Sequence, residues 1–142
     1  MKLTVAFLLL SLTVVGNSRG THFRQTTVPD REVILKLGER VVIEDTLGNQ
    51  LRVRFVAVPK DERCPEGAAC LVPGNAKVEL RFKSSNKESL SVILNTDDGP
   101  QAVELPGIRL TLIALNPRPQ LGVVIDPKDY KATLSVSRPG LK

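Results

Sequence analysis

The sequence predicts an all-β fold, an antiparallel β-sandwich of eight to nine short strands with immunoglobulin-like or jelly-roll-like architecture. Three observations predict it. Short segments rich in Val, Ile and Leu recur at regular spacing between Gly, Asn, Asp and Pro. Apolar and polar residues alternate with a period of two, which places one face on a core and the other in water. No stretch has the period of an amphipathic helix.

The expected strands follow one another along the chain. The first two, residues 32–37 and 40–45, are joined through Gly38, as in a hairpin turn that begins with glycine. The long segment 51–58 is expected to end at Pro59, because proline cannot donate a hydrogen bond to a ladder. Further strands are expected at residues 77–83, 89–95, 102–105, 108–115, 121–125 and 130–137.

The first 20 residues have the layout of a signal peptide. Lys2 precedes an apolar run over residues 3–15, and the small residues Gly16, Ser18 and Gly20 follow. That run is shorter than the roughly 17–25 residues that span a bilayer. The sequence therefore predicts an exported chain, periplasmic or extracellular, without a membrane span after cleavage.

The rest of the chain is expected to form one domain. Residues 1–20 are assigned to the signal peptide, 21–31 to a flexible entry segment, 32–138 to a single β-sandwich and 139–142 to a tail. Cleavage removes Lys2 and Arg19 from the 20 bases, which leaves 18 against 15 acids and a net charge of +3. With four Phe, one Tyr and no Trp, platforms for base stacking are scarce, so no nucleic-acid partner is expected.

One segment differs from this regular scaffold: residues 60–75, KDERCPEGAACLVPGN, here called the cysteine loop. It contains Cys64 and Cys70, and an isolated cysteine pair in an exported protein predicts a disulfide. A thiol redox pair or a metal thiolate site is less favoured, since the spacing is not C-x-x-C and His22 is far away in sequence. A bridge across seven residues stabilises a fold by about 2 kcal/mol and mainly fixes the shape of its loop.

The charged residues around the bridge allow three interpretations. Asp61, Glu62 and Glu66 could hold a hard cation, or they could be solvated loop charges, which is the favoured interpretation. An ion pair is the third, from Asp61 to a strand arginine such as Arg52, Arg54 or Arg81. No metal and no cofactor are expected. The candidate interaction residues are Asp61, Glu62, Arg63, Pro65, Glu66 and Gly74.

The cysteine loop resembles a known pattern. DERCPEGAACLVPGNA, residues 61–76, resembles the D-S-R-C-P-x4-C-x-W-x-G-x-A motif of an uncharacterised family of bacterial exported proteins and lipoproteins. Glu62 stands where that family usually has serine, and Val72 stands where it usually has an aromatic residue. The resemblance extends more weakly to residues 77–83 and 108–119, and it implies no activity. The matching residues are Asp61, Arg63, Cys64, Pro65, Cys70, Gly74 and Ala76.

These observations predict a non-catalytic binding or structural module that displays the cysteine loop to an unknown protein or small-molecule ligand. No catalytic constellation is present, because a Ser-His-Asp arrangement would need His22. One alternative is a protease-inhibitor-like protein in which the bridge holds residues 66–69 extended. Another is a small envelope hydrolase, which would need a pair of carboxylates facing a cleft.

Overall fold

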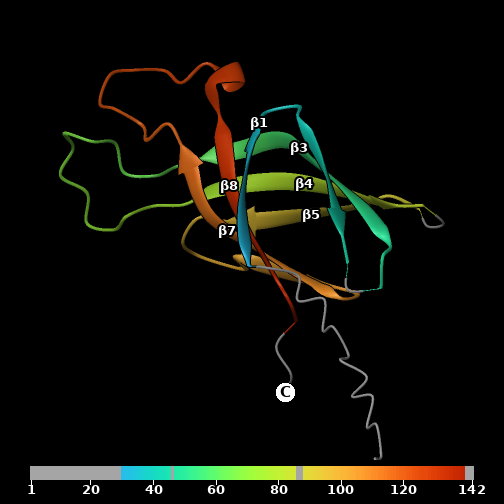
Figure 1. Ribbon diagram of the computed structural model, residues 1–142. Helices are drawn as coiled ribbons and strands as arrows, with labels where there is room; N and C mark the ends of the chain where they lie inside the picture. Colours follow the sequence, from blue (N-terminus) through green and yellow to red (C-terminus); the bar gives the residue numbers. More distant parts are fainter. Residues whose placement is uncertain (1–29, 46, 86–87, 140–142) are drawn as a thin grey trace, which may run out of the picture.

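The protein is a sandwich of two four-stranded antiparallel β-sheets, as the alternating pattern predicts (Figure 1). The structure is a computed structural model that describes residues 30–45, 47–85 and 88–139. The expectations for the signal peptide, for the entry segment up to residue 29 and for residues 140–142 lie outside the described residues.

Each sheet is mainly a meander of consecutive strands. The first contains, in order across the sheet, β1 (Arg31–Lys36), β8 (Lys131–Ser137), β7 (Ile108–Asn116) and β6 (Ala102–Leu105). The second contains β2 (Arg40–Glu44), β3 (Gln50–Asp61), β4 (Ala76–Ser84) and β5 (Leu90–Asn95). A short 3-10 helix, η1 (Pro127–Asp129), precedes β8. This order differs from the Greek-key connections of immunoglobulin-like and jelly-roll sandwiches.

The core lies between the two sheets and is formed by alternate residues of their strands. In β4, Val78, Leu80 and Phe82 are buried, whereas the charged residues that alternate with them are exposed or, at Glu79, half-buried. Leu134 and Val136 of β8 belong to the same core. Complete burial of each such side chain contributes about 1.5–3 kcal/mol. The sheets are therefore a firm base for the loops at their ends.

The link between β1 and β2 is a corner between the sheets, so the expected hairpin is wrong. β1 pairs with β8, whereas β2 pairs with β3. The Leu37 N–H donates to the Tyr130 carbonyl in the first sheet (3.0 Å), and the Gly38 N–H donates to the Phe55 carbonyl in the second (2.8 Å). Gly38 has a φ of +84°, which favours glycine. Glycine is typical of both a hairpin turn and a corner between sheets, so the local sequence does not reveal which sheet the next strand joins.

β3 continues through Pro59 to Asp61, so the expected end of this strand is also wrong. The register against β4 shifts between Phe55 and Ala57 and again between Ala57 and Lys60. Pro59 lies inside the second irregularity, where its missing N–H breaks no ladder bond. β2 pairs only with the first half of β3. The second half therefore carries the chain beyond the neighbouring strand and into the cysteine loop.

A register shift in β7 changes which of its residues face the core. Leu112 is buried as the alternation predicts, and the shift follows between Leu112 and Ala114. Beyond it, Ile113 is exposed and Leu115 is buried, so Leu115 faces the core in place of Ala114, which was expected there.

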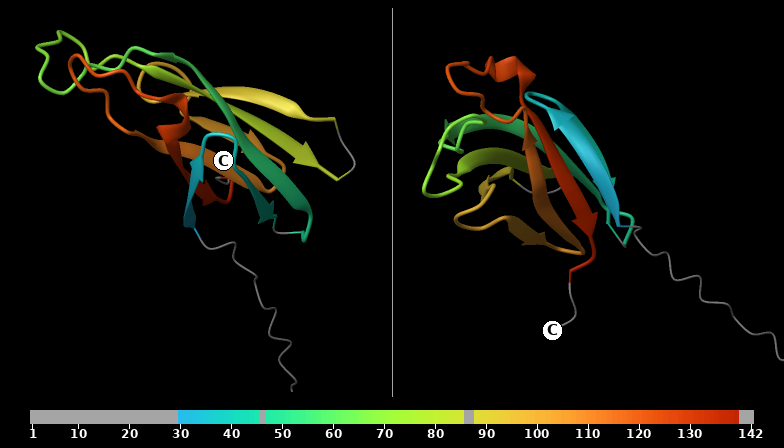
Figure 2. Two further views of the ribbon diagram at one scale, coloured as in Figure 1. Left: turned by 90° about the horizontal axis from the view of Figure 1, so that it is seen from above. Right: turned by 90° about the vertical axis from the view of Figure 1, so that its left-hand side faces the viewer.

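Residues 121–125 form no strand, so that expectation is wrong as well. They belong to a loop, residues 117–126, that connects β7 to η1 and is here called the proline loop. Gln120 forms isolated bridges with Glu66 and with Val123. The proline loop and the cysteine loop lie side by side at one end of the sandwich (Figures 1 and 2).

Candidate functional site

The Cys64–Cys70 disulfide is present, as the sequence predicts, with a Cα–Cα distance of 6.0 Å. The cysteine loop extends from the adjacent ends of β3 and β4, away from the two sheets (Figure 1). The bridge joins two parts of one loop and no separate strands. Its effect is therefore on the shape of the loop.

The segment inside the bridge is a turn. The Ala68 N–H donates to the Pro65 carbonyl at 3.1 Å, and Gly67 between them has a φ of +86°. This pattern is that of a type II turn with glycine in its third position. An inhibitor-like loop would require residues 66–69 to be extended, and this turn shows that they are not. The Glu66 backbone is also occupied by hydrogen bonds to the proline loop.

The return of the cysteine loop depends on a close contact at Gly74. The Glu62 N–H donates to the Asn75 carbonyl (2.8 Å), and the Cys64 N–H donates to the Pro73 carbonyl (2.6 Å). Between these bonds Gly74 has a φ of +72°, and a Cβ there would lie 2.0 Å from the Glu62 carbonyl oxygen. Only glycine fits this position without moving the backbone.

Arg63 ties the base of the cysteine loop to the other sheet. Its Nε and Nη2 donate to the two carboxylate oxygens of Asp61, at 2.8 and 2.6 Å. Its Nη1 donates to the Leu115 carbonyl, and its Nη2 also donates to the Pro117 carbonyl at 2.9 Å. The Tyr130 hydroxyl donates to Asp61 Oδ2 at 3.0 Å. Asp61 therefore forms an ion pair, as the third interpretation proposed, but with Arg63 and not with a strand arginine such as Arg52, Arg54 or Arg81. The favoured interpretation, a solvated charge, is wrong for Asp61.

This network determines the ionisation of its members. Burial alone would raise the pKa of Asp61, but hydrogen bonds from Arg63 and its charge outweigh burial and hold that pKa below the ordinary 3.8. Burial, together with the hydrogen bond to Asp61, raises the pKa of Tyr130 to about 12. At neutral pH the carboxylate is charged and the phenol is a neutral donor, as the observed bonds require.

The proline loop completes the site, and the sequence did not indicate it. The Glu66 N–H donates to the Pro119 carbonyl at 2.8 Å, and the Leu121 N–H donates to the Glu66 carbonyl at 3.1 Å. These two bonds join loops that are more than 50 residues apart in sequence. The pattern of Leu121 to Ile125 was taken for a strand because it is apolar, but these residues remain largely exposed.

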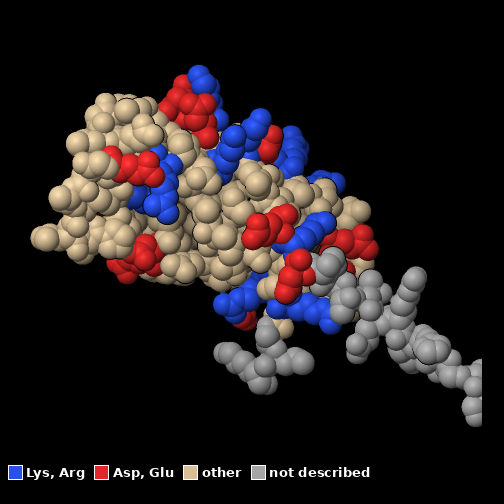
Figure 3. Space-filling model, turned by 60° about the vertical axis from the view of Figure 1, so that its left-hand side comes forward, with Lys and Arg blue, Asp and Glu red and all other residues tan. Residues whose placement is uncertain are grey.

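Five aliphatic side chains of the two loops project into solvent. Leu71 and Val124 are almost completely exposed, and Val72, Leu121 and Val123 are more than half exposed. These five residues are here called the apolar tip. The loop-bearing end of the molecule is largely free of charged side chains (Figure 3). Of the residues matched to the exported family, none belongs to the apolar tip.

Asn75, which the sequence did not single out, fixes the far side of the cysteine loop. Its Oδ1 accepts from the Thr96 N–H (3.0 Å) and the Asp97 N–H (3.1 Å), and its Nδ2 donates to Asn95 Oδ1 (2.8 Å). Asn95 is itself buried. The turn after β5 is thereby joined to the last residue of the loop, and no sequence spacing signals this contact.

The acidic residues of the cysteine loop do not converge on a cation site. Asp61 is bonded to Arg63, and Glu62 pairs with Lys60 at 2.9 Å. Within residues 30–45, 47–85 and 88–139, no three His, Cys, Asp or Glu side chains gather as metal ligands would. Glu62 and Glu66 are exposed, which agrees with the favoured interpretation of solvated loop charges, and only Asp61 is bonded into the base of the loop.

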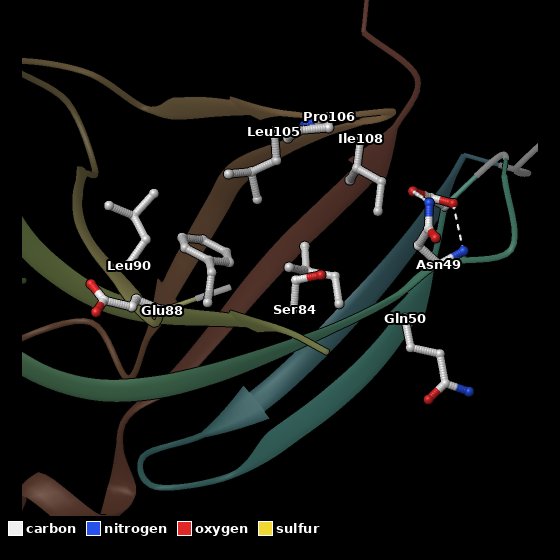
Figure 4. Close-up of a pocket in the computed structure, with 11 residues that line it drawn as sticks. Asn49, Gln50, Ser84, Glu88, Leu90, Leu105, Pro106 and Ile108 are labelled. Carbon is white, nitrogen blue, oxygen red and sulfur yellow. Dashed lines mark hydrogen bonds between the residues drawn. The ribbon is translucent and has the colours of Figure 1, made fainter. Parts of the chain in front are cut away.

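A separate cavity of about 420 Å³ lies at the opposite end of β3 (Figure 4). Its apolar wall comes from both sheets, with Phe82 and Leu90 on one side and Leu105 and Ile108 on the other. Leu90, expected to point inward, is half-exposed here. At the rim, Asp45 already accepts hydrogen bonds from the backbone and side chain of Asn49. The cavity shares no residue with the two-loop site.

Comparison with protein-family models, with curated proteins and with solved structures finds no match. The resemblance of the cysteine loop to the exported family therefore stays a prediction. No helix in the described part of the chain is long and apolar enough to cross a membrane.

Proposed function

We propose that the protein is an exported, non-catalytic binding module and that its apolar tip inserts into an apolar surface of a partner protein. The observation that carries this proposal is the exposure of five aliphatic side chains on two loops that are bonded to each other. Clustered exposed apolar residues are typical of interaction sites, whereas single ones are not. The disulfide supports export, because such bonds persist in oxidising compartments.

The base of the site is built to hold the apolar tip in one conformation. The disulfide closes the cysteine loop, Arg63 bonds it to one carbonyl of the opposite sheet and one of the proline loop, and Glu66 bonds it to the proline loop again. A surface ordered before binding loses less entropy on association than a flexible one does. The loops therefore suit recognition by a preformed surface.

The charges near the apolar tip favour a protein partner over an anionic bilayer. A loop that inserts into anionic lipid is normally accompanied by unpaired cations that attract the headgroups. Here Lys60 pairs with Glu62 at 2.9 Å, and Lys128 pairs with Asp126 at 2.7 Å, which leaves Arg118 as the one cation of the two loops that forms no ion pair with a described carboxylate. The apolar tip has no acid, base or nucleophile, and Asp61 and Tyr130 beneath it are bonded to each other, which supports binding rather than catalysis.

Site-specific photo-crosslinking in the cells that produce the protein tests this proposal. A photo-reactive amino acid at Val124 should form a covalent adduct with one protein, and the same residue at Ile34 should not. Ile34 is the matched control, because it is exposed and aliphatic but lies on β1 in the first sheet. Adducts of equal yield from both positions, or lipid adducts alone from Val124, would contradict the proposal.

The identified partner then allows a direct affinity measurement. Leu71→Asp should weaken binding by about tenfold or more, since burial of a leucine contributes about 1.5–3 kcal/mol. Ile34→Asp makes the same chemical change outside the site and should leave the affinity unchanged. Equal weakening by both substitutions would show that the apolar tip is not the contact surface.

A further inference from the structure

The outer face of the second sheet carries a group of cations whose arrangement the fold does not explain. Arg40, Arg54 and Arg81 are direct cross-strand partners on β2, β3 and β4. In the next row of the same face, Arg52 of β3 is the partner of Lys83 on β4. All five side chains are exposed. These five residues are here called the basic face.

The basic face has almost no counter-charge. Arg81 is 3.9 Å from Glu79, which is a long ion pair, and its Nε donates weakly to the Ser91 hydroxyl at 3.4 Å. The other four cations form no ion pair with a carboxylate of the described residues. Some cations at other places are paired more closely, for example Arg109 with Glu104 at 2.8 Å. Like charges directly opposite each other destabilise a sheet, so this face is unfavourable for the isolated fold.

We propose that the basic face binds a linear polymer of repeating phosphate groups. Neighbouring strands lie about 4.8 Å apart, so the row Arg40–Arg54–Arg81 presents three guanidinium groups within about 10 Å. Four of the five cations are arginines, and the planar guanidinium group binds phosphate through paired hydrogen bonds, which lysine cannot do. A flexible chain can lie across both rows of the exposed face. This site is independent of the apolar tip.

The composition of the basic face distinguishes a phosphate polymer from two other polyanions. The aromatic residues of β2 to β5, Phe55 and Phe82, are buried, so these strands offer no ring on which a nucleic-acid base could stack beside the cations. Two half-exposed apolar side chains lie beside these rows, Val42 as the β2 partner of Arg52 and Ile93 as the β5 partner of Glu79, and they are little to insert into a bilayer. The face therefore offers charge and hydrogen-bond donors, which a phosphate chain needs.

Titration of the processed, disulfide-bonded chain with inorganic polyphosphate tests this inference. The affinity should be measurable at about 50 mM NaCl and fall steeply towards about 200 mM, because binding releases counterions. Arg52→Gln/Arg54→Gln should weaken binding by about tenfold or more at low salt and lower the slope of log Kd against log salt by about two. The matched control is Arg31→Gln/Lys131→Gln, which removes the same charge from exposed positions on the first sheet and should change the affinity less than about twofold.

Folding of the variants is checked separately, by circular dichroism and urea unfolding. Arg52→Gln/Arg54→Gln should unfold at the same or a slightly higher urea concentration, since it relieves like-charge repulsion. Equal weakening in both double variants, or absence of polyphosphate binding at low salt, would overturn the inference. Tighter binding of single-stranded DNA with the same number of phosphates, or binding to anionic vesicles alone, would overturn the assignment to a phosphate polymer.

Discussion

Replacement of Gly74 by alanine tests whether backbone geometry dictates glycine in the return of the cysteine loop. The new Cβ would lie 2.0 Å from the Glu62 carbonyl oxygen and 2.9 Å from its carbonyl carbon. Both are backbone atoms, so no side-chain rotation can relieve the overlap. The chain must separate Glu62 from Gly74, and the hydrogen bonds on either side of this contact must lengthen or break.

The expected loss of stability has two sources. Alanine at a φ of +72° is disfavoured by about 1 kcal/mol relative to glycine. The two bonds beside it, from Glu62 to Asn75 and from Cys64 to Pro73, each contribute about 0.5–1.5 kcal/mol. Gly74→Ala should therefore destabilise the fold by about 2–4 kcal/mol, which is large against a typical total of about 5–15 kcal/mol.

Urea unfolding followed by circular dichroism measures this loss, and Gly122→Ala is the control. Gly122 has nearly the same φ, +76°, but a Cβ there would meet no atom within 4 Å. That variant should lose only the conformational part, about 1 kcal/mol. If both substitutions lower the free energy of unfolding equally, close contact with Glu62 is not what requires glycine at position 74.

Three further predictions concern the base of the site. Tyr130 is the only tyrosine and there is no tryptophan, so ultraviolet absorbance should report its ionisation directly. Because its folded-state pKa is raised to about 12, Tyr130 contributes stability that is lost as the pH rises from 10 towards 12. Asp61→Asn should lower that pKa, whereas an unchanged titration would contradict the contact between Tyr130 and Asp61. Because the folded-state pKa of Asp61 is lowered, its contribution should be lost as the pH falls below about 4, and Asp61→Asn should flatten this acid limb in urea unfolding at several pH values. Cys64→Ser/Cys70→Ser should reduce the free energy of unfolding by about 2 kcal/mol yet keep the far-ultraviolet spectrum of the sandwich, and loss of the fold would show that the bridge does more than shape one loop.

The scaffold is well predicted by the sequence where one rule decides a residue's position. Val78, Leu80 and Phe82 alternate with charged residues in β4, and burial follows from that period alone. The errors occur where the outcome depends on a partner that the segment itself does not specify. Gly38 marks a turn, but the second sheet decides that the turn is a corner, and the bulges in β3 decide that Pro59 can remain within a strand.

The candidate site was also predicted only in part, because several of its contacts join segments that are far apart in sequence. The disulfide follows from two cysteines in a chain that the sequence predicts to be exported, since they have no other partner in the sequence. The proline loop escaped prediction because its apolar residues have the composition of a buried strand and only contact with Glu66 reveals their position. Tyr130 appeared as one more inward residue of a strand, although its hydroxyl reaches Asp61 across 69 positions of sequence.

The base of the two-loop site and its contact surface use different residues. Asp61, Arg63 and Gly74 hold backbone segments together through bonds that tolerate little change. Leu71 and Val124 touch almost nothing within the molecule, so the fold places little restriction on their identity. Substitution at the apolar tip should consequently change what the module binds without altering its stability, whereas substitution at the base should change stability first and binding only through it. On the proposed function, a motif found by sequence, such as the one around Cys64, would identify the base of the site, and the exposed residues between its fixed positions would specify the ligand.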